Sequence, residues 1–490
     1  MERRGPLLAL ALVFAVAAPA AAQGKTVHYT IRSQAFQLGG FQTILPKVWT
    51  KTPEKDGYIT RFYARLVYAN GKRVPIQRVM LHHIVFVDVG YPGGAIKTTS
   101  CPGRRAGESF WGTGEEHQRM ILPPGYGYHV DHRDHWRLQA MLMSHSLESQ
   151  KLYVQYSFTM VVGQKLTPVK PLWLRANGCE DLYPSYEIQG GEGTDATDVR
   201  STDWKMPISG RIVAAGAHLH GSAKDMTITE PACGNRVLVD HTPLFGYPSD
   251  KVYRIRPILH EPGPIATAYF MSKTGIPVTR GTVLRVTGYY DGQYPHPQVM
   301  AISHVYVARD NTVKPGCQPM PKDAHYYWTR KDGRPYAPRQ AIPFNAYDSA
   351  SGRVVQIDKP AGPDVVEAGD AAVSVADDGF HPSNLTIVPG ASVTWSWTGT
   401  ADHNVFYADG PRDVDSGTLP KGSQYHYTFN VPGTYRLFCW LHPLTMHQEI
   451  TVTDSSAEFG ASPPAQSSRV VVRIPGNVDD GYGEGDGLGL

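Results

Sequence analysis

Apolar and polar residues alternate in short runs along most of the chain, and turn residues separate the runs. Such runs occur at 78–87 and 152–158, and again at 211–215, 283–287 and 304–307. A two-residue period with breaks rich in glycine and proline is typical of antiparallel strands. No long stretch keeps a helical period. The pattern therefore predicts an all-β protein.

The positions of these runs divide the chain into six parts. We expect a signal peptide, two antiparallel, jelly-roll-like β-sandwich domains, a polar linker, a smaller all-β domain, and a tail that is disordered or mediates assembly. Their ranges, in that order, are 1–22, 25–175, 176–315, 316–369, 370–453 and 454–490.

The N-terminus predicts export. Arg3 and Arg4 precede an apolar run at 7–18, and small residues follow at 20–22, so a mature chain would start near Gln23. The apolar run is too short for a comfortable transmembrane segment, and we expect no other membrane span. The predicted location is periplasmic, extracellular or at the cell surface. A net charge of only +3 indicates no nucleic-acid partner.

Four residues near the C-terminus supply the donor atoms of a copper site. Cys439, His442 and Met446 are close together in sequence, and His403 lies 36 residues before the cysteine. One thiolate, two imidazoles and a weak thioether are the ligands of a mononuclear blue-copper site. The alternative is a copper-free sandwich with a buried cysteine. The presence of all four ligand types favours copper.

The segment 373–453 resembles the cupredoxins, such as plastocyanin, amicyanin and pseudoazurin. The resemblance includes 378–382, 385–390 and 393–395, and it continues through 431–435 before the cysteine. It implies a Greek-key β-sandwich with one type 1 copper and a role in electron transfer. Multicopper oxidases and copper nitrite reductases have a histidine before the cysteine that links the blue copper to a second centre. Phe438 stands there, so that link is absent.

The remaining cysteines predict two disulfides. If Cys439 binds copper, an even number is left, and an oxidising compartment favours their pairing. Three pairings are possible among Cys101, Cys179, Cys233 and Cys317, and the sequence does not select one.

Histidine and methionine also gather upstream. The clusters are His82 with His83, His218 with His220, and Met300 with His304. His218 and His220 share one face of a strand, so they can bind one ion. His82 and His83 would point to opposite faces, and both reach one metal only at a bulge or a strand end. Taken alone, each pair is also compatible with ordinary surface or core histidines.

The order of these clusters resembles the copper type II, ascorbate-dependent monooxygenases, that is, the peptidylglycine α-hydroxylating and dopamine β-monooxygenases, over about residues 75–310. The resemblance implies up to two type 2 coppers separated by a solvent gap. His82 and His83 match ligands of the electron-transfer copper. The matches to the oxygen-binding, catalytic copper are His218, His220 and Met300.

Three positions depart from that family. Met141 occupies the place of the third electron-transfer ligand, and His145, on the same strand parity, is an alternative ligand. His304 replaces a tyrosine near the family's methionine and is a further candidate ligand. Gly216 stands where the peptide hydroxylase has an arginine that holds the substrate carboxylate. Peptidylglycine is therefore not the expected substrate.

Three functions remain open from the sequence, and so does the question of whether the chain is an enzyme. The first is an exported copper monooxygenase that hydroxylates an unknown substrate with O2, with electrons supplied through the blue-copper domain. The second is a non-enzymatic extracellular protein that binds copper or transfers electrons. The third is a surface assembly protein. A redox partner or a small-molecule reductant is the expected partner, and the sequence leaves the oligomeric state undetermined.

Overall fold

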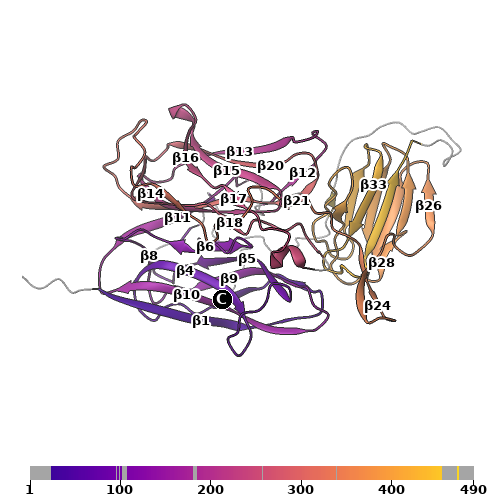
Figure 1. The fold of residues 1–490 in the computed structure, drawn as a ribbon, viewed down its shortest axis with the longest axis horizontal. Coiled ribbons are helices and arrows are strands. Elements are labelled where there is room, and N and C mark those ends of the chain that lie inside the picture. Colours follow the sequence, from indigo (N-terminus) through magenta and orange to yellow (C-terminus); the bar gives the residue numbers. More distant parts are fainter. Residues whose placement is uncertain are drawn as a thin grey trace, which may run out of the picture.

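The protein consists of β-sandwiches. The computed structural model describes residues 24–454 except 95–96, 99, 102–106, 180–184, 256–257 and 338, together with 472–473. Figure 1 shows two sandwiches stacked on one another and a third beside them at the right. The described helices are the short 3-10 turns η1 (Pro231–Cys233) and η2 (Lys251–Arg254). The all-β prediction is confirmed, and the predicted signal peptide lies outside the described residues.

The first sandwich encloses an aromatic core. One sheet contains β1 (Lys25–Leu38), β10 (Gln150–Val162), β4 (Gly57–Val67), β8 (Tyr126–Val130) and β7 (Met120–Ile121). The facing sheet contains β2 (Thr43–Ile44), β3 (Lys47–Thr50), β9 (Trp136–Ser144), β5 (Val79–Asp88) and β6 (Glu108–Gly114). Phe62, Trp111 and Trp136 are buried between the sheets, and the ring of Phe62 contacts both tryptophans. This burial is the hydrophobic contribution that the alternating pattern predicts.

The second sandwich continues a sheet of the first. Its larger sheet contains β11 (Thr167–Arg175), β22 (Ala301–Arg309), β14 (Gly210–Leu219), β19 (Tyr269–Val278) and β23 (His325–Tyr327). The other contains β13 (Thr197–Lys205), β20 (Val283–Asp291), β15 (Ala223–Glu230) and β16 (Arg236–Asp240). Strand β11 pairs in parallel with β8, so one ten-stranded sheet runs through both sandwiches. The junction therefore departs from the predicted antiparallel pattern, and β6 lies against β11 and β14 there.

The third sandwich is built at the C-terminus. One sheet contains β26 (Asp364–Glu367), β29 (Asn384–Ile387), β34 (His447–Val452), β33 (Gly433–Phe438) and β31 (Phe406–Asp409). The other contains β28 (Gly379–His381), β27 (Ala371–Ala376), β30 (Ser392–Trp397), β32 (Gln424–Thr428) and β35 (Val472–Arg473). The range predicted as a linker holds β26 and the hairpin of β24 (Asn345–Asp348) with β25 (Arg353–Gln356). Much of that range is thus ordered structure.

The third sandwich docks onto the second. Two further strand pairs lie in the second sandwich, β12 (Tyr186–Ile188) with β21 (His296–Val299) and β17 (Pro243–Leu244) with β18 (Ala266–Thr267). In β21, the backbone amide of Gln298 donates to Glu187 at 2.9 Å, and its side-chain amide donates to Asp415 of the third sandwich at 2.7 Å. Leu444 of the third sandwich packs against the core of the second. These contacts fix how the two units face each other.

Three carboxyl groups meet at this contact, and their pKa values are raised. Burial raises the pKa of Asp413 to about 7, and the charge of Asp415 adds to the effect. Burial, followed by repulsion from Asp413, raises the pKa of Glu187 well above its usual range. Burial likewise raises the pKa of Asp415, while hydrogen bonds oppose that rise. Such groups favour the neutral acid in the docked state.

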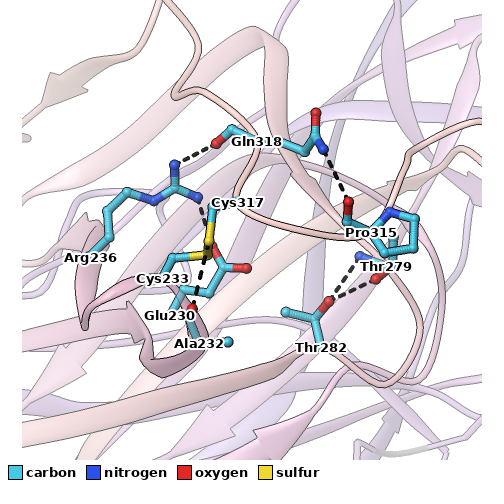
Figure 2. The surroundings of a disulfide bond; sticks show 9 residues. All are labelled: Glu230, Ala232, Cys233, Arg236, Thr279, Thr282, Pro315, Cys317 and Gln318. Carbon is cyan, nitrogen blue, oxygen red and sulfur yellow. Dashed lines mark hydrogen bonds and ion pairs between the residues drawn. A yellow bond between two sulfur atoms is a disulfide. The ribbon is translucent and has the colours of Figure 1, made fainter.

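The four predicted cysteines form two disulfides, Cys101 with Cys179 and Cys233 with Cys317. Figure 2 shows the second, which ties η1 to the segment that precedes β23. Beside it, Arg236 forms an ion pair with Glu230 at 2.7 Å. Cys439 is the free cysteine and is buried. Within the described residues, no helix is long and apolar enough to cross a bilayer.

Replacing Cys233 and Cys317 together by serine is expected to lower the free energy of unfolding of the second sandwich by about 2–5 kcal/mol, because the cross-link no longer restricts the unfolded chain. Calorimetry of the full chain measures the shift. The third sandwich contains neither cysteine, so its unfolding transition is the internal control. An unchanged unfolding temperature for the second sandwich would contradict the expected contribution.

The docking contact is expected to weaken as the pH rises. The folded-state pKa of Asp413, about 7, lies above its ordinary value of 3.8, so its contribution is complete below 3.8 and is lost as the pH rises through about 7. Hydrogen exchange at the Gln298 amide, corrected for the intrinsic pH dependence, should show more frequent opening at pH 8 than at pH 5. Glu187→Gln, which removes one titrating group, should flatten this difference. Equal opening at both pH values would refute the prediction.

Candidate metal centres

The predicted C-terminal ligands lie on two adjacent loops. His403 is in the segment between β30 and β31, while Cys439, His442 and Met446 lie between β33 and β34. We call residues 439–446 the copper loop. Its backbone closes on itself: the amide of His442 donates to the Cys439 carbonyl at 2.9 Å, and the Cys439 amide donates to the Met446 carbonyl at 3.1 Å. This closure holds the three ligand candidates in a fixed arrangement.

The donor atoms converge at the separation that a shared metal requires. The Nδ1 atoms of His403 and His442 are 3.0 Å apart, and Sγ of Cys439 is 3.6 Å from Nδ1 of His442. Two nitrogens that each lie about 2.0–2.1 Å from one metal are separated by roughly 3 Å, and a longer metal–sulfur bond widens the spacing. His403, Cys439 and Met446 are fully buried. The residues therefore fit a type 1 copper.

Neighbouring groups orient these ligands. Nε2 of His403 lies 3.0 Å from a carboxylate oxygen of Asp377, which holds the ring in place. The backbone amide of Asn404 donates to Sγ of Cys439 at 3.4 Å, and the Asn404 side chain accepts from the Trp440 amide at 3.0 Å. Burial raises the pKa of the Cys439 thiol to about 11. Since a metal binds the thiolate, metal binding at neutral pH displaces this proton.

The adjacent histidines of the N-terminal half meet at a bulge. The register between β5 and β9 shifts between Leu81 and His83, so His82 is the extra residue. A bulge re-aims side chains that a regular strand would send to opposite faces. The Nδ1 atoms of His82 and His83 lie 3.1 Å apart as a result. The two imidazoles therefore converge at a bulge, as the sequence analysis required for both to bind one metal.

The second histidine pair joins the first. Nε2 of His218 lies 3.2 Å from Nε2 of His220. The ring centroid of His82 is 5.4 Å from that of His220, and the centroid of His83 is 6.4 Å from that of His218. The prediction of a solvent gap between the two pairs is therefore wrong. Strand β6 pairs with β5 and packs against β14, which brings the two pairs together.

Sequence analysis missed three carboxylate–histidine pairs around these residues. Their imidazole nitrogens and carboxylate oxygens lie 2.7–3.1 Å apart in His218–Glu116, His260–Glu115 and His296–Glu261. A carboxylate that holds one ring nitrogen fixes the ring and leaves the other nitrogen for a ligand. The pairs join separate segments of the chain, so no sequence spacing reveals them. The adjacent residues Glu115 and Glu116, and the dipeptide of His260 with Glu261, were the available signals.

We call His82, His83, His218, His220 and His260 the histidine cluster. Burial lowers the pKa of His82 and of His220 well below 6.5, and it lowers the pKa of His83 to about 3. These imidazoles are therefore neutral at pH 7, which is the state that binds metals.

Other predicted ligands lie at the margin of the cluster. Met141 pairs with His83 across β5 and β9. Nδ1 of His145 lies 3.4 Å from the carbonyl of Ile76. His304 stacks on Trp173 with ring centroids 4.1 Å apart. Their surroundings do not place His145 or His304 among the converging nitrogens.

Met300 and Gly216 occupy the same sheet. Met300 is buried immediately before β22 and has the same strand parity as His304. A Cβ atom at Gly216 would lie 2.5 Å from Oε1 of Gln118. An arginine at this position would therefore require the Gln118 side chain to move.

A cavity of about 90 Å³ separates the histidine cluster from the third sandwich. Its lining includes His82, His220 and His260 of the histidine cluster, together with Phe406 and Trp440 of the third sandwich. Trp440 directly follows Cys439 in the copper loop. The cavity therefore lies between the two candidate metal regions.

With this geometry established, comparisons with known proteins identify the last domain. The family model described as copper binding proteins, plastocyanin/azurin family, matches residues 370–453. Amicyanin-alpha of Methylorubrum extorquens is 37% identical over 79 residues, which are 16% of this chain and 66% of that protein. The chain thus spans just under two thirds of that relative.

Solved structures of cupredoxins also align with a part of the chain. A purple cupredoxin from Nitrosopumilus maritimus has 26% identity over 17% of this chain and 100% of that chain, with a TM-score of 0.16. An oxidised amicyanin mutant has 26% identity over 17% of this chain and 81% of that chain, with a TM-score of 0.16.

Residues 370–453 form a plastocyanin/amicyanin-like cupredoxin domain. Such a domain implies a type 1 copper and a role in electron transfer. The two disulfides and this domain are consistent with an extracellular or periplasmic location. The monooxygenase resemblance of residues 75–310 remains a prediction.

His442→Ala is expected to abolish the blue absorption of the copper-loaded protein, because it removes one of the two imidazole ligands. His447→Ala is the matched control: its ring is also buried near the copper loop, but Nε2 lies 3.0 Å from the Pro443 carbonyl instead of facing the sulfur. Visible absorption measures both variants. A blue His442→Ala protein would show that the assigned ligand set is wrong.

Proposed function

We propose that the chain is a copper oxidoreductase in which the cupredoxin domain exchanges electrons with a metal centre at the histidine cluster. The shared cavity carries this proposal, because residues of the cluster and Trp440 of the copper loop both line it. Trp440 is covalently next to Cys439, so the copper loop itself reaches the cavity wall. This arrangement gives the electron a short route from the thiolate ligand to the cluster.

The docking contacts support the same proposal. Leu444 anchors the copper loop in the core of the second sandwich, and Gln298 bridges to Asp415. A redox partner held in one chain has a high effective concentration, and a fixed orientation avoids a search for the productive pose. A soluble redox protein or a small-molecule reductant would then supply the cupredoxin domain with electrons from outside.

The proposed reaction is the hydroxylation of a small substrate with O2. Copper held by His218, His220 and Met300 would supply the oxygen-activating chemistry that the monooxygenase resemblance implies, and His82 and His83 would bind a second copper. The chain's own residues hold these metals, keep the imidazoles neutral and limit access. A cavity of about 90 Å³ is smaller than the ~150 Å³ engineered cavity that admits benzene. A cavity of this size fits a small molecule as the substrate.

A non-enzymatic electron carrier or copper-binding protein is the second candidate. Met141, and not a histidine, faces His83 across the strand pair. The third histidine of the family's electron-transfer site is thus missing from the expected position. In this alternative, the histidine cluster binds copper without reacting with O2. The two candidates differ in what happens to electrons stored on the cupredoxin domain.

Reoxidation of the reduced blue copper by O2 tests the proposal. In the copper-loaded full chain, His220→Ala is expected to slow the return of the blue absorption after anaerobic reduction and mixing with O2, because the electrons lose their exit. The fully oxidised variant should keep its blue colour. His132→Ala, which alters a histidine paired with Asp56 on the surface of the first sandwich, is the control. Equal reoxidation rates in the unaltered protein and both variants would contradict the proposed electron route and favour the electron-carrier alternative.

A further inference from the structure

We propose that His82, Glu115 and His260 together bind a divalent first-row transition-metal ion at the edge of the cavity. One donor atom from each of the three residues lies within 4.8 Å of the others. Nε2 of His260 is 2.8 Å from Oε1 of Glu115, which is close to the spacing of two donors on one metal. The ring centroids of His82 and His260 are 4.8 Å apart.

This ligand set differs from those that the sequence predicts. His82 was expected to act with His83, but Nδ1 of His82 already faces His83 at 3.1 Å. Its Nε2 is therefore the nitrogen left for the side of His260. Glu115 and His260 belong to neither predicted copper site. His82 comes from β5, Glu115 follows β6, and His260 lies between η2 and β18, so three separate segments converge here.

The charge of Glu115 supports a bound cation. Its side chain is 8% exposed, and among the described residues its ion pair is with His260 and with no lysine or arginine. The backbone amide of Gly263 donates to the second carboxylate oxygen at 3.1 Å, which fixes the group. A buried carboxylate is costly unless a positive charge compensates it. Nitrogen donors of His82 and His260 converge on this carboxylate, so a metal ion bound among the three would compensate its charge.

The donor set restricts the metal. Two imidazoles and one carboxylate suit copper, zinc, iron or nickel, and Cu(II) binds such a site more tightly than the other divalent ions of the first row. Cu(II) is therefore the probe ion that should occupy the site most readily. If the site fails to bind Cu(II), the weaker-binding ions will not occupy it either.

An open position on the metal would face the cavity. His82 and His260 line it, and so does His296. Glu261 holds Nδ1 of His296 at 2.7 Å, while Nε2 of His296 is buried without a hydrogen-bond partner among the described residues. That unpartnered nitrogen can hydrogen-bond a small molecule bound in the cavity. His296 would then act as a positioning residue.

The inference rests on the proposed function in one respect only, because both require a metal in the N-terminal half. Electron transfer from the cupredoxin domain is not needed for the site to exist. Metal binding and blue-copper reoxidation therefore test the two proposals separately.

The test is Cu(II) binding to the full chain in a Cys439→Ser background, which removes the type 1 site. Copper content and the EPR spectrum are compared for the background protein and for the added changes His260→Ala and Glu115→Gln. We expect each added change to remove one EPR-detected copper, because each removes one of only three protein ligands. His28→Ala is the control, because that histidine is exposed on β1 and its Nδ1 lies 3.1 Å from the Thr159 hydroxyl, away from the candidate ligands.

Glu115→Gln keeps the shape of the side chain, so it tests the site even where His260→Ala disturbs folding. The blue absorption of each variant with Cys439 restored reports whether the fold is intact. If both variants bind Cu(II) with the same content, affinity and spectrum as the background protein, the site is refuted. If the background protein itself binds no copper, the site is refuted as well. If copper is lost from the variants while reoxidation of the blue copper is unaffected, the site stands and the proposed electron route fails.

Discussion

The parallel pairing of β8 with β11 is the constraint on which the arrangement of the N-terminal half depends. It joins two sandwiches into one sheet, so β6 packs against β14 and the bulged end of β5 approaches the end of β14. His82 and His83 then meet His218 and His220, although more than 130 residues separate them in sequence. Burial at this junction lowers the pKa values of His82, His83 and His220 and so favours their neutral imidazoles. A hinge between independent sandwiches would leave the same histidines as two unrelated pairs.

The third sandwich completes the site from the opposite side. Its copper loop binds the second sandwich through Leu444 and presents Trp440 to the cavity. The type 1 ligands His403, Cys439 and Met446 are buried, and His442 is half-buried. The carboxyl groups around Asp413 make the contact with the second sandwich sensitive to pH. The cupredoxin domain is thus positioned as a fixed neighbour of the histidine cluster. Its orientation, and not its fold alone, is what connects the two candidate metal regions.

The sequence predicted those features that local spacing determines. Cys439, His442 and Met446 lie on one loop, so their convergence follows from the sequence between them. The need for a bulge at His82 was also predictable, because neighbouring strand residues point to opposite faces. Contacts between distant segments were not predictable: the disulfide pairing, the closure of the solvent gap, and the approach of Glu115 to His260 all depend on how the sheets pack. Glycine at 216 indicated a lost arginine, and the structure adds that the Gln118 side chain occupies the space beside it.

The central claim is that two metal regions face one cavity, and anomalous diffraction at the copper absorption edge tests it most directly. Crystals of the copper-loaded full chain should give one peak among the type 1 ligands His403, Cys439 and His442. The account predicts at least one further peak at the histidine cluster, across the cavity from Trp440. A single peak at the type 1 site would contradict it, and the N-terminal half would then be a scaffold without a metal.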